Sequence, residues 1–125
     1  MGVKQYIKES ISIPDDVPEG NRNGNCYEVA LHKFMDNPRR YTLVHGVVTG
    51  QGPIAGMQYG HAWVEDGDKI IDMTLPSHLR SLPKDVYYAL GHIDITRRYN
   101  ANQVLKMLDK FGTYGPWDPV FDDYY

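Results

Sequence analysis

The feature that most constrains the fold of this chain is the stretch YGHAWVEDGDKIIDMT at residues 59–74. Two short runs of aromatic and β-branched residues flank an Asp-Gly pair, Asp66-Gly67, which is a pattern typical of a β-hairpin. His61 stands near the start of the first run and Asp72 near the end of the second, where a purely structural hairpin would favour Val, Ile or Thr. The stretch predicts antiparallel strands and gives two polar side chains to explain.

A two-residue loop made of the Asp-Gly pair places His61 directly opposite Asp72. Directly opposed residues point to the same side of a sheet, with Cβ atoms about 4.5–5.5 Å apart, a distance that lets an imidazole N–H donate to a carboxylate. The same register opposes Glu65 and Asp68 as like charges beside the turn. A three-residue loop would change this pairing.

The only cysteine of the chain, Cys26, stands before a helical pattern. The pattern predicts a helix over residues 26–35, with Asn25 as its N-cap and an end at Asn37-Pro38. A cysteine at the start of a helix lies near unpaired backbone N–H groups and the positive end of the helix dipole, which favour a thiolate. The sequence therefore predicts a reactive thiol at this helix start.

Together, Cys26, His61 and Asp72 form the set needed for nucleophilic catalysis. The thiolate would attack a carbonyl carbon, His61 would act as base, and Asp72 would orient the imidazole. The oxyanion would take the Cys26 backbone N–H and a second donor from the preceding polar run, with Asn23 or Asn21 as candidates and Asn25 beside them. Trp63, on the His61 face, would pack beside the site or line it.

A structural alternative exists for each residue taken singly. A lone cysteine is often a small buried hydrophobe, and a lone histidine near a sheet is more often structural than catalytic. The combination of a helix-start cysteine with a hairpin that presents His61 near Asp72 favours the functional interpretation.

The remaining patterns predict a single α+β domain over residues 1–125. Beyond the hairpin they comprise strands at 41–48 and 92–99 and helices at 83–90 and 100–111, the last with Asn100 as N-cap and Gly112 as its stop. This order predicts an antiparallel sheet covered by helices on one side, with the cysteine-bearing helix at the N-terminal end. Residues 1–24 are predicted as a leader, and residues 113–125 as an acidic, aromatic tail that packs back through Trp117 and Phe121.

Composition narrows the classes of function. Hydrophobic residues make up 42% of the 125 residues and charged residues 23%, as in ordinary globular proteins. The net charge of −3 and the scattered cations give no nucleic-acid surface. Apolar runs fall short of the ~20 residues of a membrane span, the N-terminus lacks a secretory pattern, and a single cysteine cannot form an intramolecular disulfide. We expect a cytoplasmic protein with no membrane or nucleic-acid partner and no cofactor.

A metal site is the weaker interpretation of the polar residues. His45, His61 and Asp72 would have to form it, and the HxH and HExxH spacings that mark such sites are missing from the sequence. No metal is therefore predicted.

The ordered set NGNCYEVA, YGHAWVED and IIDMT resembles the core of the papain-like and transglutaminase-like cysteine enzymes. In that superfamily a helix start carries the nucleophilic cysteine, one strand the histidine and the next strand the aspartate. The resemblance covers about residues 23–75 and implies Cys26 as nucleophile, His61 as base and Asp72 as orienter. The chain has Tyr27 where transglutaminases commonly have Trp, and Gly20 where papain-like enzymes have the Gln that helps to hold the oxyanion.

These observations predict a cysteine-dependent hydrolase, peptidase- or amidase-like, that cleaves a peptide or isopeptide-type amide of a peptide or protein substrate through an acyl-thioenzyme. Transfer of the acyl group to an amine would use the same residues. A non-catalytic protein-binding module on the same fold is the alternative from another class. Neither the substrate nor the oligomeric state follows from the sequence.

Overall fold

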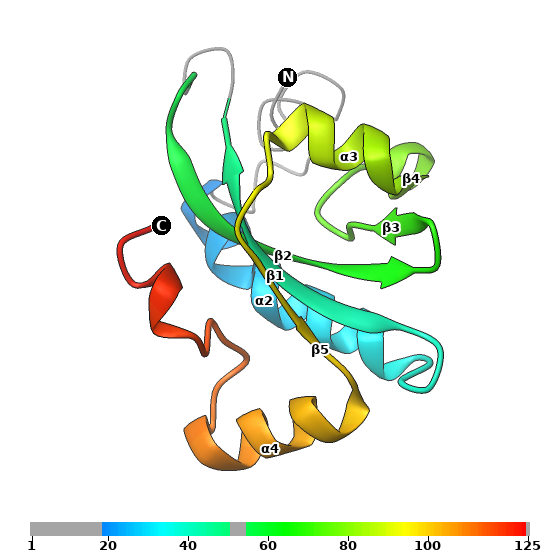
Figure 1. Cartoon of the computed structure of the whole chain (residues 1–125), viewed down its shortest axis with the longest axis vertical. Helices are drawn as coiled ribbons and strands as arrows, with labels where there is room; N and C mark the ends of the chain where they lie inside the picture. The colour runs from blue at the N-terminus through cyan, green and yellow to red at the C-terminus, as the bar shows by residue number, and fades with distance from the viewer. Residues whose placement is uncertain (1–18, 51–54, 125) are drawn as a thin grey trace.

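The chain forms an α+β structure built around one antiparallel sheet (Figure 1). The computed structural model describes residues 19–50 and 55–124, with the backbone alone described for 19–24. In chain order the described elements are α2 (Glu19–Met35), β1 (Thr42–Thr49), β2 (Gln58–Asp66), β3 (Lys69–Ile71), the 3-10 helix η2 (Ser77–Leu79), β4 (Ser81–Pro83), α3 (Lys84–Gly91), β5 (Thr96–Tyr99), α4 (Ala101–Phe111) and the 3-10 helix η3 (Pro119–Phe121). The predicted α+β class is confirmed.

The sheet has five strands in the order β4-β3-β2-β1-β5. Neighbouring strands run antiparallel throughout. The long strands β1 and β2 form its centre, and β5 returns late in the chain to pair with β1. β3 pairs only with the end of β2, so among the described strands none lies beside the other half of β2 on that side.

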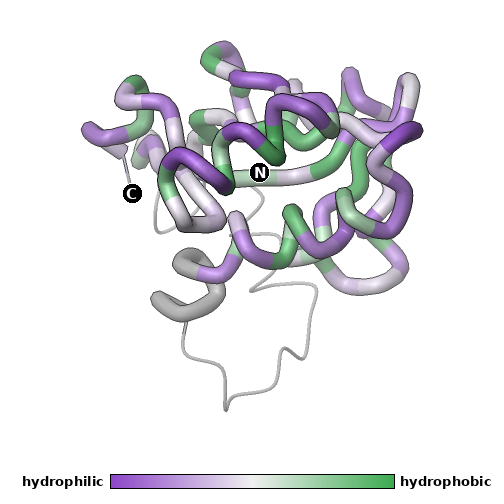
Figure 2. Tube along the Cα trace, turned by 90° about the horizontal axis from the view of Figure 1, so that it is seen from below, coloured by the Kyte–Doolittle hydropathy of each residue, from purple (hydrophilic) through white to green (hydrophobic). Residues whose placement is uncertain are grey.

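Helices cover both faces of the sheet, so the predicted one-sided arrangement is wrong. α2 and α4 pack on one face, through a cluster that includes Phe34, Leu43 and Val64. α3 packs on the other, through a cluster that includes Val44, Trp63 and Tyr87. Both central strands are buried along almost their whole length, and in Figure 2 hydrophobic and hydrophilic stretches alternate along the helices that cover them. Strands buried on both faces carry near-continuous apolar runs instead of strict alternation.

The start of α2 differs from the prediction, whereas its end at Met35 agrees. α2 begins at Glu19, so Asn25 is not its N-cap and Cys26 lies well inside the helix. The polar segment from Glu19 to Asn25 carries no apolar periodicity, and the pattern that predicts a helix therefore starts too late.

The later elements follow their local signals more closely. α3 and α4 agree with the predicted helices within one residue, and α4 has the predicted Asn100 cap, completed by Gln103 in a capping box. β5 is shorter than predicted, and β4 was not predicted. Trp117 and Phe121 are buried, which confirms that the C-terminal segment packs on the core. No helix in the described ranges has the length and apolar character needed to cross a membrane.

The hairpin turns one residue later than the sequence predicts. Asp66 pairs with Lys69, so the loop consists of Gly67 and Asp68. Gly67 has a φ of 64°, a left-handed conformation that glycine adopts without steric cost. The predicted opposition of Glu65 to Asp68 is wrong, because Asp68 belongs to the loop.

This shift changes the predicted pairing of His61 with Asp72 but not the face on which they lie. Moving the loop by one residue moves each cross-strand partner by two, and residues two apart on a strand point to the same side. β3 ends at Ile71, and the Asp72 backbone N–H donates to the Arg80 carbonyl at 2.8 Å. The two residues are therefore diagonal neighbours instead of directly opposed ones.

Candidate active site

A buried histidine–aspartate pair lies at the half of β2 that does not pair with β3. Nε2 of His61 donates to Oδ2 of Asp72 at 2.9 Å. His61 is 5% exposed and Asp72 is fully buried. A buried carboxylate is costly unless it is paired and hydrogen-bonded, so the surroundings of Asp72 decide what the pair can do.

Four donors surround the Asp72 carboxylate. Oδ2 accepts from His61 and from the hydroxyl of Tyr87 at 2.6 Å. Oδ1 accepts from the backbone N–H of Thr74 at 3.0 Å and from its hydroxyl at 2.6 Å. Each oxygen thus has two partners, which stabilises the ionised form and fixes the carboxylate relative to the imidazole.

Cys26 brings a thiol to the same imidazole. The residue is 1% exposed, and its side chain lies close enough to His61 to help raise the pKa of the imidazole. Because Nε2 of His61 binds Asp72, Nδ1 is the ring nitrogen left for the thiol. The imidazole therefore lies between a sulfur and a carboxylate, although the three residues come from α2, β2 and the loop after β3.

The charges of the pair stabilise each other. Burial alone would lower the pKa of His61, but the charge and hydrogen bond of Asp72, together with Cys26, raise it above its usual value. Burial alone would raise the pKa of Asp72, but the charge and hydrogen bond of His61, with the hydrogen bonds from Thr74 and Tyr87, lower it. Burial and the neighbouring Asp72 raise the pKa of Tyr87, so this phenol stays protonated as a donor. The geometry favours an imidazolium–carboxylate pair.

The oxyanion donors predicted from the sequence are the Cys26 backbone N–H and the side chains of nearby asparagines. Inside α2 the Cys26 N–H falls beyond the first four helical N–H groups, and such a group normally donates to the carbonyl four residues earlier. The predicted use of the Cys26 N–H as an oxyanion donor therefore loses its basis. Asn25 is exposed, and the side chains of Asn23 and Asn21 lie outside the described residues.

Trp63 packs beside the site. It is fully buried, with its ring centroid 6.1 Å from that of His61 and 5.2 Å from that of Tyr87. Gly46, opposite His61 on β1, leaves room for the indole, because a Cβ there would lie 2.4 Å from Cη2 of Trp63. Trp63 therefore supports the site from the core and does not line an open surface.

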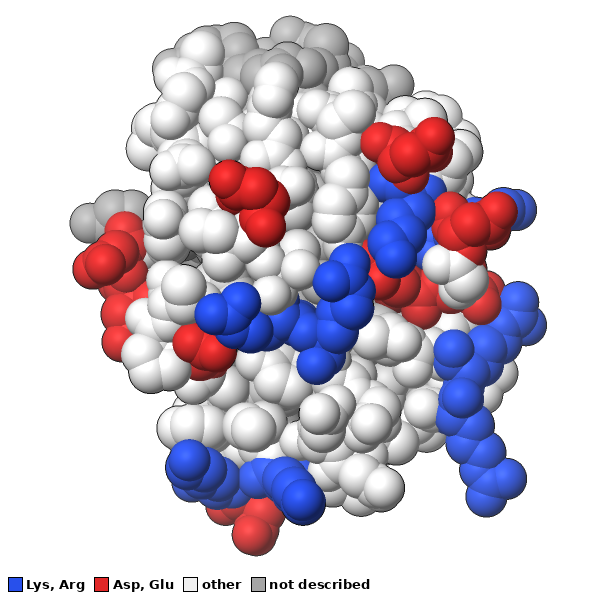
Figure 3. Space-filling model, viewed as in Figure 1, with Lys and Arg blue, Asp and Glu red and all other residues white. Residues whose placement is uncertain are grey.

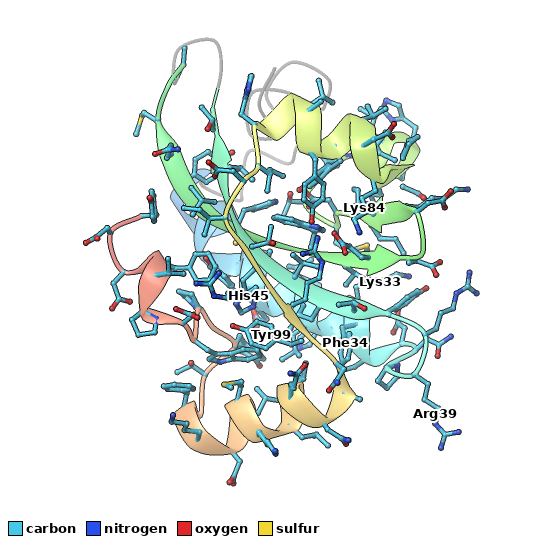
Figure 4. The ribbon with its side chains drawn as sticks, in the orientation of Figure 1. Lys33, Phe34, Arg39, His45, Lys84 and Tyr99 are labelled. Carbon is cyan, nitrogen blue, oxygen red and sulfur yellow. The ribbon has the colours of Figure 1, made fainter. Side chains whose placement is uncertain are left out.

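Glu65 forms a second buried carboxylate on the same face. It accepts from Arg98 at 2.9 and 3.2 Å and from the hydroxyl of Tyr88, and it pairs with Lys84 at 3.2 Å. Figure 4 shows Lys84 near β3 and α3. In Figure 3 acidic and basic side chains lie next to one another over this side of the molecule. This network joins β2, β5 and α3 and places no thiol or imidazole beside Glu65.

His45 lies on the opposite face from His61 and belongs to a separate environment. Its ring is packed among those of Tyr27, Tyr99 and Trp117, with centroid distances of 4.8, 5.1 and 4.9 Å (Figure 4). Neither ring nitrogen has a hydrogen-bond partner among the described residues. In the described part of the chain no three His, Cys, Asp or Glu side chains gather to hold a metal ion, and His45 does not join His61 and Asp72.

A groove of about 500 Å³ lies between α4, β5 and the C-terminal segment. Its lining includes Arg97, Met107, Phe111 and Trp117, and it includes none of the three candidate catalytic residues. Arg97 is already paired with Asp118 at 2.8 Å. The groove is therefore separate from the site around His61.

Comparison of the chain with protein-family models, curated proteins and solved structures found no match in any of the three. The assignment of the site thus depends on its geometry. Sequence reasoning brought forward Cys26, His61 and Asp72 but missed Tyr87. Thr74 was visible only as the last residue of the segment IIDMT.

Proposed function

We propose that the protein is a cysteine-dependent hydrolase that cleaves a peptide or isopeptide-type amide through an acyl-thioenzyme. The observation that carries this proposal is the position of His61, which donates to the buried carboxylate of Asp72 and lies near enough to Cys26 for the thiol to raise its pKa. A base held by a carboxylate next to a nucleophile is the arrangement that catalytic triads use on unrelated folds. The order of the three residues along the chain, on α2, on β2 and directly after β3, also supports the resemblance to papain-like and transglutaminase-like enzymes.

In the first half-reaction Cys26 is a thiolate and its proton lies on Nδ1 of His61, while Nε2 keeps its bond to Asp72. The thiolate attacks the carbonyl carbon, so a C–S bond forms and an electron pair moves to the oxygen. When this intermediate collapses, the C–N bond breaks and the imidazolium gives its proton to the departing amine. The product is an acyl-thioenzyme.

In the second half-reaction His61 takes a proton from water, and the hydroxide attacks the acyl carbon. The C–S bond breaks, the carboxylic acid leaves and the thiol regains its proton. An amine in place of water would give acyl transfer by the same steps, and incorporation of an added amine into the product separates this reaction from hydrolysis.

The second candidate function is a non-catalytic binding module on the same fold. The burial of Cys26, which is 1% exposed, favours it, because a structural cysteine is typically an inert, small buried hydrophobe. This candidate predicts an unreactive thiol and binding of a partner that survives Cys26→Ala.

Alkylation of Cys26 by iodoacetamide, followed by intact mass over a range of pH, tests the proposal. Cys26 is the only cysteine, so all labelling reports on one site. We expect labelling well below the ordinary thiol value of about 8.5, because the imidazolium stabilises the thiolate. His61→Ala should abolish this labelling, whereas the matched control His78→Ala, at an exposed position in η2, should retain it. Slow labelling with an ordinary pH profile, unchanged in His61→Ala, would contradict the proposed hydrolase and favour the binding module.

Turnover gives the second half of the test. An activated nitrophenyl ester should acylate the wild-type protein at Cys26, as seen by release of nitrophenol and by a mass increase of one acyl group. Cys26→Ala and His61→Ala should release no nitrophenol above the uncatalysed rate.

A further inference from the structure

Two consecutive tyrosines of α3 donate to two different buried carboxylates. The hydroxyl of Tyr87 donates to Oδ2 of Asp72 at 2.6 Å, and the hydroxyl of Tyr88 donates to Oε2 of Glu65. Both contacts lie on the α3 face of the sheet, with Trp63 packed against both rings. The Asp72 contact reaches the candidate site, whereas the Glu65 contact does not.

We propose that Tyr87 is a positioning residue of the Cys26 site, an inference that rests on the proposed function. Tyr87 fixes Asp72 and sets the pH range over which the His61–Asp72 pair is charged. Tyr87 shares Oδ2 with Nε2 of His61. Two donors that converge on one oxygen fix its position, and with it the rotation of the imidazole that leaves Nδ1 for the thiol.

The phenol also moderates the basicity of the carboxylate. A donor to an ionised carboxylate favours the ionised form and withdraws negative charge from it. Without this donor, Oδ2 would hold the imidazolium proton more strongly, and Asp72 itself would protonate more readily. Because the Tyr87 hydroxyl is buried and stays protonated, it acts as a permanent donor.

The side chains that face the His61–Asp72 pair come from several elements. α2 contributes Cys26, and β2 contributes Tyr59, whose ring centroid lies 6.3 Å from that of His61. The loop after β3 contributes the uncharged Thr74. The cluster of Glu65, Arg98 and Lys84 belongs to the same face but is bound to itself. Tyr87 is thus the donor from α3 in direct contact with Asp72.

The test compares Tyr87→Phe with Tyr88→Phe. Both variants keep the ring and remove one tyrosine–carboxylate hydrogen bond from α3, but only the first touches Asp72. The readouts are the pH profile of Cys26 alkylation and the titration of the His61 imidazole followed by NMR. For Tyr87→Phe we expect the His61 titration to move to higher pH. Because a more strongly held imidazolium proton favours the thiolate, the alkylation profile should move to lower pH, with alkylation on the acid side faster by about tenfold, the size of one hydrogen bond to a charged group. Tyr88→Phe should keep the wild-type profile.

A profile and a titration unchanged in Tyr87→Phe, or shifted equally in Tyr88→Phe, would overturn the proposal. Fluorotyrosine in place of every tyrosine is the second measurement should Tyr87→Phe not fold. It makes each phenol a stronger donor and should move the His61 titration to lower pH, so an unmoved titration also counts against Tyr87. If the wild-type thiol is unreactive at every pH, the proposed function fails, while the NMR titration still decides whether Tyr87 governs the pair.

Discussion

His45 and His61 lie on neighbouring strands and are both buried, yet their surroundings give them opposite protonation. His61 has a carboxylate within hydrogen-bond distance, and this partner raises its pKa. His45 is packed among aromatic rings without a hydrogen-bond partner in the described part of the chain, and burial lowers its pKa to about 3. At the scale of the residue, the partner decides between a charged imidazole and a neutral one that serves packing.

Asp72→Asn should reduce activity less than Cys26→Ala or His61→Ala. The amide keeps the shape of the carboxylate but loses its charge, so it orients the imidazole less well and does not stabilise the imidazolium. The nucleophile and the base take part in bond changes directly, whereas Asp72 acts through His61. Release of nitrophenol from the activated ester, measured for the three variants under one condition, checks this order. Equal and complete loss in all three would show that the carboxylate is indispensable in itself.

The sequence identified the three candidate residues because each stands in a short local pattern. Cys26 precedes an apolar helical stripe, and His61 and Asp72 flank one hairpin. Tyr87 was missed because its contact spans 15 residues and depends on how α3 crosses the sheet, for which no local pattern exists. The Cys26 N–H was predicted as an oxyanion donor because the helix was expected to begin at Cys26, whereas α2 begins at Glu19.

At the scale of the element, boundaries follow the sequence where local capping chemistry defines them. α4 has a capping box at Asn100 and ends at Gly112, which adopts a φ of 67°, and both ends are predictable from those residues. α2 has no such signal at Glu19. The hairpin was predicted but its loop was displaced by one residue, because in Glu-Asp-Gly-Asp the position of glycine within the turn decides the register.

Gly46→Ala should destabilise the sheet. The new Cβ would lie 2.4 Å from Cη2 and 3.0 Å from Cζ3 of the fully buried Trp63, and overpacking of this kind typically costs about 1–3 kcal/mol of unfolding free energy. Urea unfolding of the variant measures the loss. Trp63→Phe removes the outer indole carbons, so Gly46→Ala should cost less in that background, as a double-mutant cycle would show. The same cost in both backgrounds would assign the effect to the backbone and not to the indole.

At the scale of the whole molecule, the arrangement of helices on two faces is what gathers the site. The thiol comes from α2 on one face, while Asp72 and Tyr87 belong to the other, and they meet at the half of β2 that β3 does not cover. The sequence contained a signal for this arrangement in the two central strands, where apolar residues on both faces are interrupted mainly by His45, His61 and Glu65, which predicts burial on both sides. Which helix covers which face depends on contacts between distant parts of the chain, and no local pattern encodes them.

The two buried histidines give the stability of the whole molecule a defined pH dependence. In the unfolded chain His45 takes up a proton near 6.5, whereas in the folded protein it stays neutral down to about 3. As the pH falls below 6.5, unfolding therefore gains a proton, and the free energy of unfolding decreases by up to about 1.4 kcal/mol per pH unit. His61 acts in the opposite sense, because its pKa is raised. Its contribution is complete below 6.5 and is lost only as the pH rises through the folded value.

Between pH 6.5 and the ordinary carboxyl pKa of 4.5, the slope of the unfolding free energy against pH should therefore depend on His45. His45→Leu, an apolar residue of similar volume, should flatten the slope of urea-derived unfolding free energy against pH in that window. The exposed control His78→Gln should leave the slope as in the wild type. A wild-type slope that survives in His45→Leu would mean that the ring is already protonated in the folded protein. The aromatic cluster around it would then be holding a cation instead of a neutral ring.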